Sequence, residues 1–260
     1  IWRLNLNNAQ KLLAHKLLYE GESFDTFYGV LTIIKYDNAK NITVKFNTTG
    51  YETVTRLDHI LSGQVKDKLL PSVVGVGITG DEVVSRDGKL TQEYLVWKSM
   101  LLRCYDKEVQ MKQPTYIECR ASENFKFLEY FSKWCNKQIG FKNNNWQLDK
   151  DILVKGNKIY SEDTCCFVPM EINVALTKSD KSRGKYLVGV TLNKQGTGYV
   201  ARVQVGGGKR KHLGTYATQT LAFAAYKQGK EDYIKSLANK WKDQIDHRVY
   251  EALMSYQVEI

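Results

Sequence analysis

Apolar and polar residues alternate most regularly in residues 185–216, where short runs are separated by glycine-containing turns. A period of two is typical of β-strands that bury one face. The pattern therefore predicts three antiparallel strands, KYLVGVTLNK, YVARVQVG and KHLGTY, joined by QGTG and GGKR. In the second strand, Ala201 and Val203 are expected on one face, and Arg202 and Gln204 on the other.

Helical spacing of apolar residues marks several other segments. Residues 5–20 predict a short helix that Asn7 or Asn8 caps, with four leucines on one face. Within residues 92–139, apolar stripes in WKSMLLRCY and NFKFLEYFSKWC predict helices that contribute to a core. After the three strands, Thr218 is expected to cap the alanine-rich helix TQTLAFAAYKQGKEDYIKSLANKW. Shorter helices are predicted at MEINVAL and RVYEALMSYQV.

Two further regions complete the predicted organisation. In residues 28–58, the runs YGVLTIIKYD, NITVKFNTTG and YETVTRLDHI predict a three-stranded antiparallel meander, whereas residues 146–176 show no regular period. We therefore expect an α+β fold in three modules. They are an N-terminal helix with a small β-rich domain (1–85), a helical and irregular middle (86–177), and a three-stranded antiparallel sheet packed on a helix, with a helical tail (178–260).

Charge is distributed unevenly along the chain. The 260 residues carry a formal net charge of +10, from 38 Lys and Arg against 28 Asp and Glu. Residues 178–248 contain 15 Lys and Arg but only 5 Asp and Glu, whereas residues 1–177 contain 23 against 21. The whole excess therefore lies in the C-terminal module, which favours a polyanionic partner for that module.

Cysteine usage and hydropathy restrict the class of protein. There are five cysteines, an odd number with no CxxC pair: Cys104, Cys119, Cys135, Cys165 and Cys166. This predicts reduced, mostly buried thiols in a cytoplasmic protein, and neither a disulfide framework nor a zinc ribbon. No apolar run approaches the ~18–20 residues that a helix needs to cross a bilayer, so no membrane partner is expected.

Four short sequences occur in order within residues 183–240. They are YLVGV from Tyr186, YVA from Tyr199, HLGTY from His212, and AFAAY from Ala222. In this order and spacing they resemble the APETALA/ethylene-response-factor family of DNA-binding domains. The resemblance implies a sheet that lies in the major groove of double-stranded DNA, with the helix packed behind it.

The same resemblance assigns positions that contact DNA. Base edges would be read from the three strands by Thr191, Asn193, Arg202, Gln204, Arg210 and His212. Arg can pair with guanine O6 and N7, and Gln or Asn with adenine N6 and N7. Phosphates would be bound by Lys194, Lys209 and Lys211. The first strand has fewer arginines than in the plant proteins and lacks their tryptophan, so the base preference of those proteins does not carry over.

A second set of markers runs through the middle of the chain. In order they are Trp97, Met100, Arg103, Cys104, Tyr105, Pro114, Thr115, Tyr116, Cys119, Phe125, Phe131, Trp134, Leu148, Asp149, Lys150, Asp151, Gly156, Asn157, Lys158, Pro169 and Asn173. This layout resembles the phage HNH-type homing endonucleases that carry a C-terminal APETALA-type domain. The resemblance extends over nearly all of the chain and is weaker in residues 1–90.

The resemblance implies a nuclease site that this chain does not complete. An HNH site needs a His that activates water beside an Asp, and a divalent metal held by that Asp and a later His or Asn. The Asp-His position reads Asp149-Lys150 here, and the later positions fall on Asn157 and Asn173. A lysine that is protonated at neutral pH is a poor base and a poor metal ligand. We therefore interpret the HNH site as degenerate, with no catalytic residue and no metal.

Three functional hypotheses follow. The first is a sequence-specific double-stranded DNA-binding protein of phage or mobile-element type. It would derive from a homing endonuclease and act without cleavage or cofactor, as a repressor or other DNA-targeting factor on DNA in the cytoplasm of a bacterial host. The second is an active HNH homing endonuclease that uses Mg²⁺ or Mn²⁺, in which folding supplies a distant His. The third is a protein-interaction module that blocks a host or competitor factor. A monomer on a long asymmetric site and a dimer on a palindrome both stay open.

Overall fold

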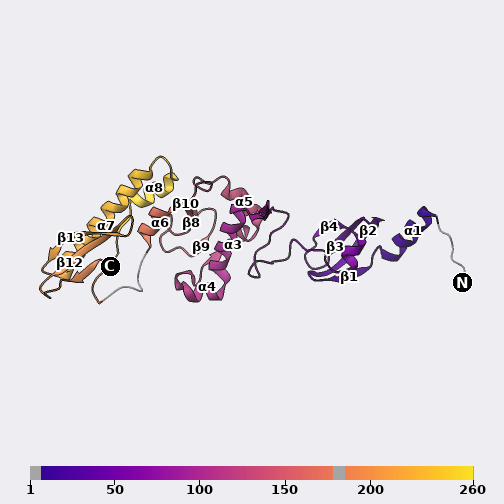
Figure 1. Cartoon of the computed structure of the whole chain (residues 1–260), viewed down its shortest axis with the longest axis horizontal. Coiled ribbons are helices and arrows are strands. Elements are labelled where there is room, and N and C mark those ends of the chain that lie inside the picture. The colour runs from indigo at the N-terminus through magenta and orange to yellow at the C-terminus, as the bar shows by residue number, and fades with distance from the viewer. Residues whose placement is uncertain (1–6, 178–184, 260) are drawn as a thin grey trace. The chain divides into compact units, whose positions relative to one another are not determined.

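The computed structural model describes residues 7–177 and 185–259, and the chain divides into two compact units. One unit extends from the N-terminal end to Leu101 and includes Lys126–Glu129. The other unit comprises the remaining described residues. Figure 1 shows the order of the elements along the chain.

The N-terminal unit is built on an antiparallel meander in the order β1-β2-β3-β4. Its elements are α1 (Asn8–Tyr19), β1 (Ser23–Thr26), β2 (Gly29–Asn38), β3 (Asn41–Phe46), β4 (Glu52–Thr55), α2 (Leu57–Leu61), β5 (Ser85–Arg86) and β6 (Lys89–Leu90). The prediction of three strands was wrong, because the short strand β1 pairs with β2 across a tight turn. The third predicted run ends in the short helix α2 and does not continue as a strand.

One face of this meander forms a hydrophobic core. Leu31 and Ile33 of β2 and Ile42 and Val44 of β3 are fully buried at alternate positions, as a strand with one covered face requires. Asn7 caps α1, because its side chain accepts a hydrogen bond from the backbone of Gln10. None of the side chains of α1 is buried, so its leucine-rich face is exposed.

The apolar helical stripes predicted in the middle of the chain are confirmed. The helices are α3 (Gln92–Tyr105), α4 (Lys107–Lys112) and α5 (Leu128–Cys135), with the short 3-10 turns η1 (Pro114–Tyr116) and η2 (Asn124–Lys126). The buried members of the stripes are Trp97, Met100, Leu101, Cys104, Phe125, Leu128, Phe131 and Cys135. These aromatic and aliphatic side chains are therefore core residues.

Residues 146–176, in which no regular period was evident, form two strands and a helix. β8 (Trp146–Asp149) pairs antiparallel with β10 (Cys166–Pro169), and α6 (Met170–Leu176) follows directly, at the predicted MEINVAL helix. Within the connecting loop, β9 (Ile159–Tyr160) pairs parallel with β7 (Arg120–Ala121). Strands this short give little periodic signal, and their pairing depends on residues far apart in sequence.

The C-terminal part has the predicted three-stranded antiparallel sheet packed on a helix, which confirms the α+β class. Its elements are β11 (Val190–Leu192), β12 (Tyr199–Val205), β13 (Lys209–Tyr216), α7 (Gln219–Trp241) and α8 (His247–Met254). Thr218 caps α7 as predicted, accepting a hydrogen bond from the backbone of Leu221 at 3.2 Å. The first strand is shorter than the predicted run, because Gly189 has a φ of +74° and its backbone lies against the ring of Tyr226.

Helix α7 belongs to two hydrophobic cores. Its N-terminal half supplies Ala222 and Phe223 to a core shared with Val190 and Ala201 of the sheet. Its C-terminal half supplies the buried side chains of a second core: Ile234, Leu237 and Ala238, packed with Cys166 and Val168 of β10, Ile172 and Ala175 of α6, and Val249 and Leu253 of α8. The three-stranded sheet and the β8-β10-α6 segment therefore share one helix.

All five cysteines are buried, and none of them forms a disulfide bond with another described residue. Burial raises the pKa of Cys104 and Cys165 to about 12, so these thiols are protonated at neutral pH. Among the described residues, no helix is both long enough and apolar enough to span a bilayer.

Candidate nucleic-acid interface

Strand register places four predicted base-reading side chains on one face of the C-terminal sheet. Arg202 lies opposite His212, and Gln204 lies opposite Arg210, so each pair points to the same side. All four side chains are exposed, whereas Ala201 and Val203 of the same strand are buried. We call the face that carries these four residues the outer face.

A bulge in β13 allows one strand to serve both faces. Register shifts between Ala201, which lies opposite Gly214, and Arg202, so that Leu213 is an extra residue on β13. A Cβ added to Gly229 of α7 would lie 2.7 Å from a methyl group of Leu213, so this leucine packs on the helix. The bulge therefore sends Leu213 to the core and leaves His212 on the outer face.

Thr191 and Asn193, the first-strand positions, have local polar partners. Thr191 lies on the outer face, and its hydroxyl accepts a hydrogen bond from Nη1 of Arg202 at 3.4 Å. Asn193 closes the turn to β12: its Oδ1 accepts from the backbone of Thr197 at 2.9 Å, and its Nδ2 donates to the Thr197 hydroxyl at 3.2 Å. The structure thus gives the Asn193 side chain a role in the turn.

The predicted phosphate-binding lysines lie around the outer face and not on it. Lys209 pairs with Val205 and Lys211 pairs with Val203, so both belong to the opposite side of the edge strand β13. Lys194 is exposed in the turn between β11 and β12. Long lysine side chains at an edge and in a turn can reach a phosphate backbone beside the face.

The positive charge of this sheet has no internal counter-charge. Residues 185–230 contain eight Lys and Arg and no Asp or Glu. None of the sheet's cations makes an ion pair with a described residue: Lys194, Arg202, Lys209, Arg210 and Lys211. The absence of Asp and Glu from residues 185–230 is a sign of an unneutralised basic surface, which the net charge of residues 178–248 alone did not show.

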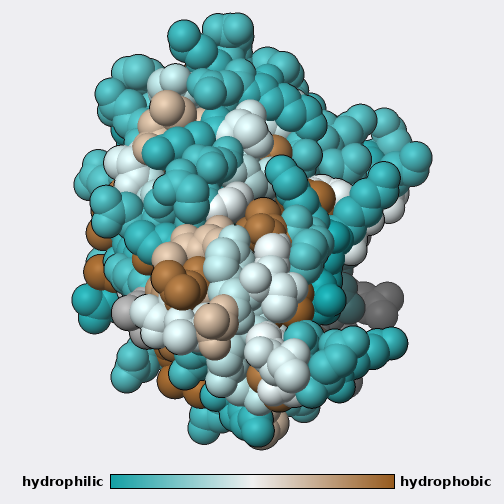
Figure 2. Space-filling model, turned by 90° about the vertical axis from the view of Figure 1, so that its left-hand side faces the viewer, coloured by the Kyte–Doolittle hydropathy of each residue, from teal (hydrophilic) through white to brown (hydrophobic). Residues whose placement is uncertain are grey.

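Lysines on α7 are held differently. Lys227 pairs with Glu231 at 2.6 Å, Lys240 pairs with Glu171 at 2.5 Å, and Lys230 donates to the backbone carbonyl of Ala175. The basic character of the sheet is therefore available to a partner, whereas that of the helix is largely committed to the fold. In the view of Figure 2, hydrophilic residues cover much of the surface, and less polar residues lie between them.

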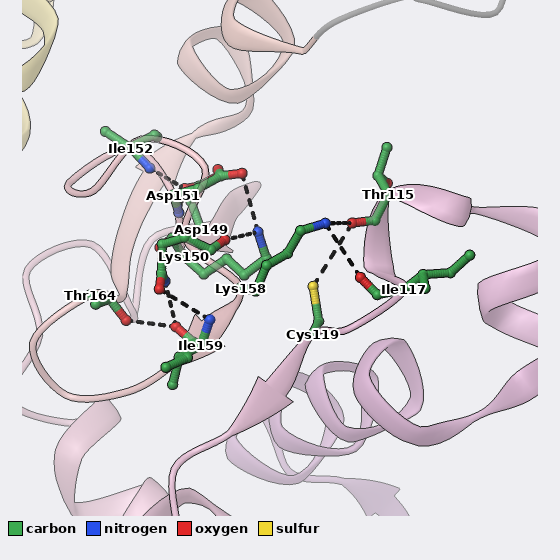
Figure 3. A network of polar contacts seen from close by, with 11 residues as sticks. Thr115, Ile117, Cys119, Asp149, Lys150, Asp151, Ile152, Lys158, Ile159 and Thr164 are labelled. Carbon is green, nitrogen blue, oxygen red and sulfur yellow. Dashed lines mark hydrogen bonds and ion pairs between the residues drawn. The ribbon is translucent and has the colours of Figure 1, made fainter.

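Lys150, the residue expected at the His position of an HNH site, is a buried structural cation. It is 6% exposed, and its Nζ donates to Oδ2 of Asp151 at 3.1 Å (Figure 3). The same Nζ donates to the carbonyl of Asn157 at 2.8 Å. The ammonium also lies 6.0 Å from the centroid of the Tyr160 ring. All of these contacts bind the loop after β8 to itself, and none leaves the ammonium free for a phosphate.

Asp149 and Asn157 support the same loop. Oδ1 of Asp149 accepts hydrogen bonds from the backbone of Asp151 and Ile152, both at 2.8 Å. Burial, together with the charge of Asp151, raises the pKa of Asp149 to about 6. Nδ2 of Asn157 donates to the carbonyls of Lys150 and Ile159, at 2.7 and 2.6 Å, so the amide ties both ends of the loop together.

The structure brings Asp149, Lys150 and Asn157 together but does not join Asn173 to them by a hydrogen bond. Nδ2 of Asn173 donates to Oε1 of Gln147. No group of three or more His, Cys, Asp and Glu side chains that could hold a metal occurs in residues 7–177 and 185–259. An ammonium has no lone pair and cannot act as a metal ligand, so Lys150 does not supply the ligand that a His would supply at this position.

Arg103 also supports this loop, a role that the sequence does not predict. Its guanidinium lies 5.4 Å from the centroid of the Tyr116 ring, and its charge interacts with the hydroxyl group of the buried Tyr160. The interaction joins the last turn of α3 to β9. No periodic or charge pattern could have identified it, because the partners are 57 residues apart along the chain.

Comparison with models of protein families, with curated proteins and with solved structures gives no match to this chain.

Proposed function

We propose that this protein binds double-stranded DNA in a sequence-specific way, with the outer face of the β11-β12-β13 sheet in the major groove. The observation that carries the proposal is the outer face itself. Arg202, Gln204, Arg210 and His212 are exposed on one side of two paired strands, within a stretch that contains no acidic residue. A two-stranded ribbon fits the major groove, and these side chain types match the donor and acceptor pattern of base edges.

The proposal includes binding without cleavage. Lys150 stands where an HNH nuclease has its His, and its ammonium is already committed to Asp151 and Asn157. The resemblance to phage homing endonucleases with an APETALA-type domain supports a phage or mobile-element protein. It would act on DNA in the cytoplasm of a bacterial host, as a repressor or another DNA-targeting factor.

Two neighbouring residues on opposite faces of β13 provide the test. The bound duplex is first selected with the wild-type chain from a random library, and dissociation constants are then measured at fixed salt. Arg210→Ala is expected to cost about 1–3 kcal/mol on the selected duplex and to relax specificity at one base pair. Lys209→Ala removes the same charge from the other face and is expected to weaken binding to all duplexes about equally.

Two results would count against the proposal. Equal losses on every duplex for both variants would remove the base-reading role of Arg210. Cutting of the selected duplex by the wild-type chain with Mg²⁺ or Mn²⁺ would contradict binding without cleavage and support the nuclease alternative.

A further inference from the structure

The hydroxyl of Thr191 accepts a hydrogen bond from the guanidinium of Arg202 on the neighbouring strand. The Nη1 to Oγ1 distance is 3.4 Å. Thr191 pairs with Val200, so Arg202 is its diagonal neighbour two residues further along β12, on the same face. Both residues are exposed, and Arg202 makes no ion pair with a described residue. The threonine is therefore the polar contact that restrains this arginine.

A neutral acceptor suits an arginine that has to read a base. A guanidinium has five N–H donors and no acceptor, so one bond from Nη1 leaves Nε and Nη2 free to form a bidentate pair. A carboxylate in the place of Thr191 would neutralise the charge and compete with guanine. A long side chain that is restrained before binding loses less conformational freedom on binding.

We infer that Thr191 is a positioning residue, which holds the guanidinium of Arg202 for base recognition and does not read a base itself. This inference rests on the proposed function, and it changes the role expected for Thr191 from contact with DNA to contact with Arg202. Thr191 thereby contributes to sequence specificity through an intramolecular hydrogen bond within the outer face.

The test measures discrimination at the base pair that Arg202 reads. The probes are the duplex selected by the wild-type full chain and its single-base-pair variants. Arg202 reads the base pair whose replacement weakens binding of the wild-type chain but does not weaken binding of Arg202→Ala. Thr191→Val is expected to lower discrimination at this base pair by about 2- to 10-fold and to leave discrimination at the other base pairs unchanged. Thr191→Ser keeps the hydroxyl and is expected to restore wild-type discrimination.

A double variant and a matched threonine separate positioning from direct contact. In the Arg202→Ala background, Thr191→Val is expected to have no further effect. Thr215 is exposed on the same face, and its hydroxyl makes no hydrogen bond with a described residue. Thr215→Val is therefore expected to leave discrimination at the Arg202 base pair at the wild-type level.

Two outcomes would overturn the inference while leaving the proposed function standing. One is full discrimination by Thr191→Val at the Arg202 base pair. The other is an equal loss from Thr191→Val with and without Arg202, which would assign Thr191 its own contact with DNA. If the wild-type chain binds a scrambled duplex as tightly as the selected one, the proposed function itself fails, and the inference fails with it.

Discussion

Lys150 is the buried cation around which the loop after β8 is organised. It places a buried positive charge between Asp151 and the carbonyl of Asn157, and Asp149 turns its carboxylate to two backbone N–H groups. A charge that is buried and hydrogen-bonded in this way organises a loop. These residues consequently form a closed cluster of hydrogen bonds and not an open metal centre.

Asp149 gives the stability of the folded protein a measurable dependence on pH. Its pKa is raised to about 6 in the folded protein, first by burial and then by Asp151. A carboxyl group with a raised pKa in the folded state contributes stability that is fully present below its unfolded pKa of about 4, and that is lost as pH rises through about 6.

Asp149→Asn removes this titration and keeps an acceptor for the two backbone N–H groups. The stability of the variant relative to wild type, measured by urea unfolding, is expected to be higher at pH 8 than at pH 4.5 by about 1–3 kcal/mol. Asp25→Asn, at an exposed position of β1, is the control and should show no such difference. A relative stability of Asp149→Asn that is the same at both pH values would contradict the raised pKa.

At the scale of elements, close approach between backbone and side chain fixes how the sheet lies on α7. The backbone of Gly189 lies against the Tyr226 ring, and a Cβ at this position would come within 2.0 Å of it. The side chain of Leu213 meets Gly229 in the same way. These two contacts allow the sheet and the helix to approach each other closely at Gly189 and Gly229.

Two glycines with the same φ separate the effect of packing from that of backbone strain. Gly189 and Gly196 both have a φ of +74°, but a Cβ at Gly196 would meet nothing within 4 Å. Gly196→Ala is expected to cost about 1–2 kcal/mol from strain alone. Gly189→Ala is expected to cost about 1–3 kcal/mol more, because the methyl group displaces Tyr226. Urea unfolding measures both, and equal losses would show that the ring moves freely.

At the scale of the whole molecule, α7 couples the proposed DNA-binding sheet to the β8-β10-α6 segment. Ile234 is fully buried in the core that contains β10 and α6, while α7 residues about two to three turns earlier cover the sheet. A helix that is common to two cores transmits a loss of packing from one to the other. The predicted boundary between residues 177 and 178 thus falls within one compact unit.

Ile234→Ala tests this coupling. The cavity is expected to cost about 2–5 kcal/mol, and hydrogen exchange should accelerate in β12 as well as in β10. Ile33→Ala removes an equally buried isoleucine from the meander of the N-terminal unit and should leave exchange in β12 unchanged. Unchanged protection of β12 in Ile234→Ala, with β10 exposed, would show that the two cores unfold independently.

The sequence by itself determined the α+β class, the three C-terminal strands, the cap of α7 at Thr218 and the apolar stripes of α3 and α5. It could do so because these features depend on periods of two and 3.6 residues and on local turns and caps. The alternation of polar and apolar residues in β12 is also enough to separate Arg202 and Gln204 from Ala201 and Val203.

Only the tertiary structure decided what depends on residues distant in sequence. Strand register placed Lys209 and Lys211 opposite the outer face, and the β13 bulge kept His212 on it. Long-range packing formed β8 and β10, buried Lys150 and joined α7 to both cores. The physical reason is that hydrogen bonding between strands and burial of charge depend on partners that only folding brings together. A local sequence pattern does not specify these partners.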